Sequence, residues 1–153
     1  MKKSLLKKVA LVLYCVFVLS LLTLVSSANQ SVGDWGYYGP VHGFSYRMQN
    51  RVGVSGRTAT AEMHVGPSGN QTIPVGNALM TARLYRDDTG VRVSSSSERE
   101  NSAAIPPGTT RYMSTTHTRS NTPYYADGIT GAFNGTDYWR YSGFRSPRRT
   151  TGS

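Results

Sequence analysis

Cysteine is nearly absent from this 153-residue chain, because its one cysteine, Cys15, lies in an apolar N-terminal segment. The rest of the chain is therefore disulfide-free and must be held together by its hydrophobic core alone. That core is lean, since only 16 residues from Asn29 onward are leucine, isoleucine, valine or phenylalanine. So small a fraction warns of disorder, but tyrosine, tryptophan and methionine add apolar surface and the charge density is low. The pattern described below favours folding.

Catalytic motifs are absent as well: the chain has no nucleophile elbow, no phosphate-binding glycine loop and no paired-histidine zinc motif. His42, His64 and His117 are isolated in sequence, so they could bind a metal only if neighbouring strands brought them together. No spacing selects a carboxylate pair for glycoside hydrolysis, and Glu62 beside His64 is the one acid with a titratable neighbour. We therefore expect no enzymatic activity, no cofactor and no metal site.

Lysine is confined to the first eight residues, at Lys2, Lys3, Lys7 and Lys8. An apolar run from Val9 to Val25 follows, and small residues then precede a predicted cleavage site between Ala28 and Asn29. This order is typical of a secretory signal peptide over residues 1–28. An apolar run of about 17 residues also reaches the lower limit for crossing a bilayer, so an uncleaved membrane anchor is the alternative.

Removal of residues 1–28 leaves 125 residues, the size of one domain, and changes the charge. The 17 basic residues become 13, all arginine, which against eight acids gives a net charge of +5. Arginine suits bidentate contact with carboxylate or phosphate and stacking on aromatic rings. The bias towards arginine has a second explanation in the codon usage of the source.

Alternation of apolar and polar residues predicts strands in the body of the chain. It is clearest in Thr58 to Val65, where Ala59, Ala61, Met63 and Val65 fall on one face. The expected strands are 43–49, 58–65, 78–86, a return strand from 91, 109–118 near a sheet edge, 124–133 and 138–144. No internal repeat or amphipathic helix is found in the part that follows residue 28.

Two hairpins are predicted from turn residues. With a four-residue turn at 87–90, Leu84 faces Val93 and Tyr85 faces Arg92, so both strands agree on the core side. The dipeptide Asn134-Gly135 favours a second hairpin. It would place Trp139 and Tyr141 on the side of the small residues Ala126, Gly128, Thr130 and Ala132.

The fold class expected from these patterns is all-β, as a single antiparallel β-sandwich or small barrel of six to eight short strands. We assign it to residues 43–144. Residues 29–42 form a lead-in rich in glycine and aromatic residues, in which Trp35, Tyr37 and Tyr38 are either packed anchors or exposed rings. Residues 145–153 are expected to be a basic, flexible tail.

The closing segment resembles a known group of proteins. Residues 124–130, Asn134-Gly135, Tyr138, Tyr141 and Ser146-Pro147 resemble the last hairpin of small secreted β-sandwich proteins of Gram-positive bacteria. Those proteins have no settled activity. The resemblance implies the fold and an extracellular location, and it carries over no functional residue.

Arginine and aromatic side chains are the strongest candidates for a binding surface. The candidate anion- or surface-binding residues are Arg83, Arg92, Arg140, Arg145, Arg148, Arg149, Tyr85, Trp139 and Tyr141. Outside a Gram-positive cell the abundant polyanions are phosphate-bearing wall polymers and the membrane surface, and nucleic acid is not expected as a partner. The leading hypothesis is a secreted, non-enzymatic protein that binds such envelope polymers. The alternatives are an exported toxin or bacteriocin-like factor, and a small secreted hydrolase that uses Glu62 and His64.

Overall fold

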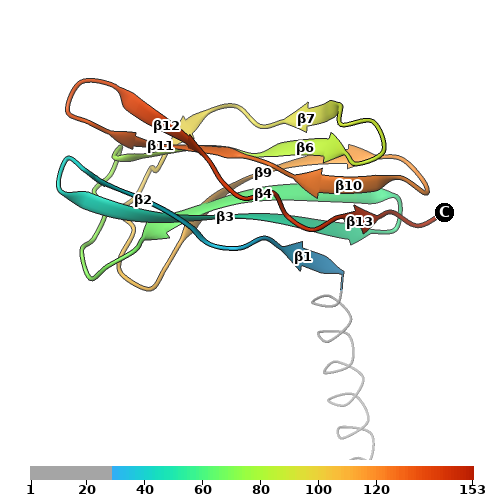
Figure 1. Ribbon diagram of the computed structural model, residues 1–153, viewed down its shortest axis with the longest axis horizontal. Helices are drawn as coiled ribbons and strands as arrows, with labels where there is room; N and C mark the ends of the chain where they lie inside the picture. The colour runs from blue at the N-terminus through green and yellow to red at the C-terminus, as the bar shows by residue number, and fades with distance from the viewer. Residues whose placement is uncertain (1–28) are drawn as a thin grey trace, which may run out of the picture. The chain divides into compact units, whose positions relative to one another are not determined.

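The computed structural model describes residues 29–153, and the regular structure in this range consists of β-strands (Figure 1). The predicted signal peptide, Met1–Ala28, lies outside the described residues and stays a prediction. Residues 31–153 form one unit by their internal contacts. Within the described range, no helix is long and apolar enough to cross a membrane.

The strands form three antiparallel sheets. Sheet 1 has the order β1-β3-β4-β9, with β2 also paired to β3, and its strands are β1 (Gln30–Val32), β2 (Gly36–Val41), β3 (Phe44–Ser55), β4 (Thr58–Pro67) and β9 (Arg111–Thr118). Sheet 2 has the order β13 (Arg149–Thr150), β10 (Pro123–Ala126), β6 (Arg83–Arg86) and β7 (Arg92–Ser95). Sheet 3 has the order β12 (Tyr138–Ser142), β11 (Ile129–Phe133), β5 (Ala78–Thr81) and β8 (Arg99–Glu100).

Sheets 2 and 3 together form one layer of a sandwich, and sheet 1 forms the other (Figure 1). One core cluster joins Tyr46 and Val65 of sheet 1 to Met80 of sheet 3. A second cluster joins Val52 of sheet 1 to Leu84 of sheet 2. Burial of these side chains between the layers is the main source of stability in a domain without disulfides.

The second layer is split in two where β10 gives way to β11 at Asp127-Gly128. Gly128 is required there, because a Cβ atom would lie 2.6 Å from the Thr81 carbonyl oxygen and 2.8 Å from Met63 Cβ. The buried side chain of Asn50 fills the gap between layers. Gly128 N–H donates a hydrogen bond to Asn50 Oδ1 at 2.7 Å, and Asn50 Nδ2 donates to the Phe144 carbonyl oxygen at 3.0 Å.

The predicted all-β fold is confirmed, with thirteen strands in the described residues rather than six to eight. The predicted inward face of β4 is confirmed, because Ala59, Ala61, Met63 and Val65 are fully buried, and Leu84 on the predicted core side of the first hairpin is fully buried as well. The count is higher because long strands are interrupted, as between β5 and β6. The two ends of the described chain also contribute strands.

The register of the two hairpins was predicted in large part. Tyr85 lies opposite Arg92 as expected, but Leu84 lies opposite Ser94, so the predicted pairing of Leu84 with Val93 is wrong. The register shifts by one residue between these pairs, which is the geometry of a β-bulge at Val93. In the second hairpin, Tyr141 lies opposite Thr130 and Trp139 opposite Ala132, which confirms the predicted sides.

Both ends of residues 29–153 differ from the expectation. The lead-in, in which no strand is predicted from the sequence, contains β1 and β2, and β2 has a register shift after Tyr38 that hides its alternation. The segment 145–153, expected to be a flexible tail, contains β13 and two buried hydroxyl residues. Ser146 Oγ accepts a hydrogen bond from Ala126 N–H at 2.9 Å, and Thr151 Oγ1 accepts one from Thr122 N–H at 3.0 Å. Composition alone could not reveal these long-range bonds.

Candidate functional site

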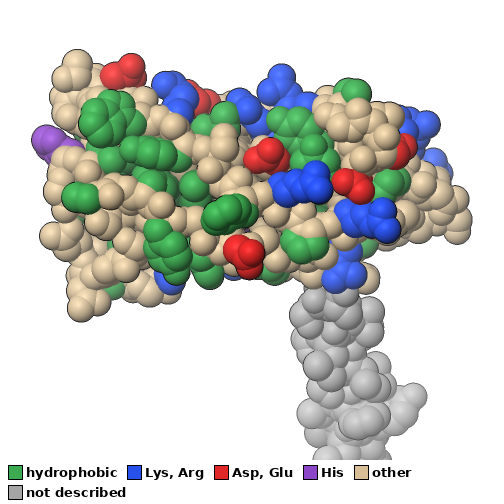
Figure 2. Space-filling model, in the orientation of Figure 1, with side chains coloured by type: hydrophobic (Ala, Val, Ile, Leu, Met, Phe, Trp, Pro, Cys, Tyr) green, Lys and Arg blue, Asp and Glu red, His purple; other side chains and the backbone are tan. Residues whose placement is uncertain are grey.

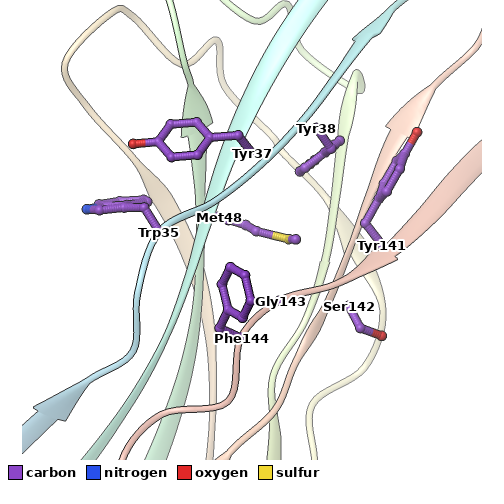
Figure 3. A pocket seen from close by; sticks show the side chains of 9 residues that line it. Trp35, Tyr37, Tyr38, Met48, Tyr141, Ser142, Gly143 and Phe144 are labelled. Carbon is purple, nitrogen blue, oxygen red and sulfur yellow. The ribbon is translucent and has the colours of Figure 1, made fainter.

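An aromatic groove lies between β2 of sheet 1 and β12 of sheet 3 (Figure 3). Its volume is about 560 Å³. It is lined by Trp35, Gly36, Tyr37, Tyr38, Met48, Tyr141, Ser142, Gly143 and Phe144. These lining residues include no carboxylate, imidazole, thiol or guanidinium group, so the groove is shaped for contact rather than for acid–base chemistry.

Two glycines keep the groove deep. A Cβ atom on Gly36 would lie 2.9 Å from Met48 Cε, on the opposite strand β3. A Cβ atom on Gly143 would lie 3.0 Å from Asn50 Nδ2. A side chain at Gly36 would press on the flexible end of Met48, and one at Gly143 would press on the buried Asn50 side chain.

A stack of three tyrosines supports one wall of the groove. The ring of Tyr38 lies between that of Tyr46, at a centroid distance of 4.9 Å, and that of Tyr141, at 4.2 Å. The Tyr38 hydroxyl forms a hydrogen bond with Thr130 Oγ1 at 2.9 Å. Burial raises the pKa of Tyr38 well above its ordinary value and the pKa of Tyr46 to about 12. This wall is therefore uncharged at any physiological pH and is fixed by the sandwich core.

Other rings of the groove face solvent. Figure 3 shows Trp35 and Tyr37 on the β2 side, Tyr141 across from them, and Phe144 with its ring between the two walls. Tyr37 is 68% exposed and Phe144 is 62% exposed. The guanidinium group of Arg47 lies 4.7 Å from the centre of the Trp35 ring, which orients that ring by a cation–π contact. Exposed apolar rings around a hollow are typical of an interaction site.

A second region, which we call the arginine–tyrosine face, lies on the outer side of sheet 2. Tyr85 and Tyr125 lie opposite each other and stack at 5.3 Å. The guanidinium group of Arg145 lies 5.0 Å from the centre of the Tyr125 ring. The face comprises Arg83, Tyr85, Arg92, Tyr125, Arg145 and Arg148. Beside Tyr125, a polar cleft of about 120 Å³ is lined by Asp87, Tyr125, Arg145, Ser146, Pro147 and Arg148.

Acidic residues neutralise part of the predicted basic surface. Arg140 pairs with Glu98 at 2.8 Å, and its guanidinium holds the pKa of that carboxyl below its usual range. Arg148 Nη1 lies 3.7 Å from Asp87 Oδ2. Figure 2 shows acidic and basic side chains interleaved over the half of the molecule that contains β6, β10 and β13. Net positive charge is therefore confined to smaller areas of this surface than the sequence suggested.

The structure divides the nine candidate residues among several places. Arg83, Tyr85, Arg92, Arg145 and Arg148 share the arginine–tyrosine face, whereas Tyr141 lines the aromatic groove. Arg140 and Trp139 lie on β12 outside the groove lining, and Arg149 lies on β13 opposite Tyr124. Sequence reasoning missed Tyr125 and every groove residue except Tyr141, and it noted Trp35, Tyr37 and Tyr38 only as packed anchors or exposed rings. Alternation in the predicted strand 124–133, with Ala126 inward, could have indicated that Tyr125 faces outward.

The histidines do not converge. His64 lies on the outer face of sheet 1, where its Nε2 is 2.8 Å from Glu62 Oε2. His117 lies opposite the buried residue Ala59 and faces inward, with its Nδ1 2.8 Å from the Tyr124 hydroxyl. Among the described residues, no three His, Cys, Asp or Glu side chains group as a metal site would require. His64 is 6% exposed and in contact with Glu62, but neither residue lines the aromatic groove or the polar cleft described above, and the hydrolase hypothesis stays a prediction.

Comparison with protein-family models, with curated proteins and with solved structures found no match to this chain. The resemblance to secreted β-sandwich proteins of Gram-positive bacteria therefore stays a prediction.

Proposed function

We propose that the protein is a non-enzymatic binding protein that holds an extended glycan in the aromatic groove. The observation that carries this proposal is the groove itself, a hollow of about 560 Å³ lined by five aromatic rings and floored by two glycines. A signal peptide over residues 1–28 would deliver such a protein to the outside of the cell, where glycans form the envelope.

The chemistry of the lining favours a sugar ring as occupant. One face of a pyranose presents C–H groups that pack on the flat face of an aromatic ring, while its hydroxyls point outward. Rigid, amphipathic rings of tyrosine and tryptophan supply contact area at little cost in conformational entropy. Trp35, Tyr37 and Phe144 are the lining residues that offer such surfaces. Among the described strands, β2 pairs only with β3 and β12 pairs only with β11. The other edge of each strand therefore adds polar backbone groups at the groove.

Binding to purified, insoluble cell-wall glycan tests the proposal. Trp35→Ala is expected to lower the affinity at least about tenfold, because aromatic residues at the centre of a contact are each worth about 2 kcal/mol. The matched control is Trp139→Ala. Trp139 is 56% exposed on β12 but does not line the groove, so this variant is expected to bind like the parent.

Equal loss of binding in the two tryptophan variants, or no loss in either, would contradict the assignment of the groove. Circular dichroism of both variants checks that the β-sandwich is retained. This control matters because Trp35 also contacts Arg47, whereas Trp139 is largely solvated.

A further inference from the structure

One short segment connects the aromatic groove to the arginine–tyrosine face. Residues 143–148 run from the end of β12 to the start of β13, and this stretch is the red diagonal between those labels in Figure 1. Gly143 and Phe144 line the groove, and Arg145 to Arg148 line the polar cleft. Phe144 and Arg145 are therefore neighbours in the chain, and each lines a different one of the two sites.

The cleft is built on a fixed platform. Ser146 is 2% exposed, its N–H donates to the Ala126 carbonyl oxygen at 2.9 Å, and its Oγ accepts from Ala126 N–H at 2.9 Å. Arg149 pairs with Tyr124 in β13. Pro147 and Arg148 therefore span a short distance between two anchored points. A site whose backbone is held in this way loses little conformational entropy when a ligand binds.

The size and charge of the cleft indicate its ligand. A volume of about 120 Å³ corresponds to about four water molecules, which suits a phosphate or carboxylate group but not a sugar ring. Arg145 and Arg148 line it together with one acid, Asp87, whose carboxylate is 3.7 Å from Arg148. Arg83 and Arg145 also act on Asp127, where they oppose the increase in pKa that burial causes. The lining of the cleft itself has two guanidinium groups against one carboxylate, so its formal charge is positive.

We propose that the Arg145–Arg148 cleft binds an oxyanion group, phosphate or carboxylate, carried by the same glycan whose sugar ring occupies the aromatic groove. The ligand class is then an anionic glycopolymer. This inference rests on the proposed function, because it uses the groove as the sugar site. Guanidinium groups bind phosphate and carboxylate through charge-assisted hydrogen bonds, and the Tyr125 ring holds Arg145 in place at the cleft.

The test compares intact cell walls with walls stripped of their phosphate-bearing polymers by acid. The parent is expected to bind intact walls at least about tenfold more tightly at low salt, and the difference is expected to shrink at high salt. The double variant Arg145→Gln/Arg148→Gln is expected to bind both wall preparations equally, with the affinity that the parent has for stripped walls. The control is Arg57→Gln/Arg111→Gln, which removes the same charge at two exposed positions outside the arginine–tyrosine face and is expected to keep the preference.

A titration with inorganic phosphate, followed by NMR of the arginine and tyrosine side chains, reports on the cleft alone. Shifts confined to Arg145, Arg148 and Tyr125 would support the anion site. Equal effects of the two double variants on wall binding, or phosphate shifts spread over all exposed arginines, would overturn it. If Arg145→Gln/Arg148→Gln loses the preference for intact walls but binds stripped walls normally, the cleft and the groove act separately. Failure of the groove proposal would instead appear as unchanged wall binding by Trp35→Ala.

Discussion

The aromatic groove and the arginine–tyrosine face are two regions of one sandwich that are built in opposite ways. Figure 2 shows hydrophobic side chains gathered over the half with β2 and β12, and most charged side chains over the half with β6, β7, β10 and β13. The groove wall is continuous with the core, because Tyr38 and Tyr141 pack against two of its clusters. The stacked tyrosines of the arginine–tyrosine face lie on the outside of sheet 2. The difference teaches that residues of the proposed binding groove also stabilise the sandwich, whereas we expect residues of the arginine–tyrosine face to be replaceable at little structural cost.

Asn50 is the residue whose loss is expected to disturb both regions most. Replacement of Asn50 by alanine would leave the Gly128 N–H and the Phe144 carbonyl without their partner inside the sandwich. Each buried polar group left unsatisfied costs about 1–3 kcal/mol, so we expect the free energy of unfolding to fall by about 3 kcal/mol. Urea denaturation measures this loss, and Gln71→Ala in an exposed loop serves as the control. A decrease below about 1 kcal/mol would show that the junction is not held by Asn50.

Two tyrosine-to-alanine variants sharpen the comparison directly. Tyr141 stacks on Tyr38 at 4.2 Å and packs on the core, whereas Tyr125 stacks on Tyr85 at 5.3 Å on an outer face. We expect Tyr141→Ala to lower the free energy of unfolding by about 3 kcal/mol, in the range for truncation of a large core ring, and Tyr125→Ala by about 1 kcal/mol. Thermal denaturation of both variants gives the order. Equal losses would mean that the two stacks are supported alike and that the contrast between the regions is wrong.

Alkaline titration reports on the buried tyrosine stack beside the groove. The pKa of Tyr38 is raised by burial, and that of Tyr46 is raised to about 12. A tyrosine whose folded pKa exceeds its unfolded pKa releases its proton first in the unfolded state. The stability that these residues contribute is therefore complete below the unfolded value of about 10 and falls as the pH rises above it. Absorbance of tyrosinate should show a late-ionising group in the parent that becomes smaller in Tyr38→Phe. A single transition near pH 10 in the folded protein would contradict the buried stack.

The smallest effect is expected at the ion pair of Arg140 and Glu98, whose side chains are both more than one third exposed. Because Arg140 lowers the pKa of Glu98, the pair stabilises the fold above the ordinary carboxyl pKa and loses this effect as the pH falls through the lowered value. Glu98→Gln should therefore lower the urea midpoint slightly at pH 7 and less at acidic pH. High salt should reduce the difference further. A large effect that persists at high salt would indicate a structural role beyond charge pairing.

Local patterns predicted much of the sandwich but little of the groove. Alternation in Thr58–Val65 identified the buried face of β4, because successive side chains of a strand point to opposite faces and only one face is apolar. The groove arises where β2 meets Gly143 and Phe144, about a hundred residues away in sequence. β2 itself reads as irregular, because glycine, proline and a register shift interrupt its alternation. The fold, rather than the local sequence, brings Arg140 next to Glu98. The basic surface predicted from the sequence alone was therefore larger than the surface whose arginine charge is not neutralised.

The emission of Trp35 tests the central claim most directly. The chain has two tryptophans, so Trp139→Phe leaves Trp35, in the groove, as the single reporter. Addition of a soluble fragment of cell-wall glycan to this variant is expected to shift and quench the emission in a saturable way, and Phe144→Ala should weaken the response. Unchanged emission from Trp35 under conditions in which the same protein demonstrably binds the glycan would contradict the aromatic groove as the binding site.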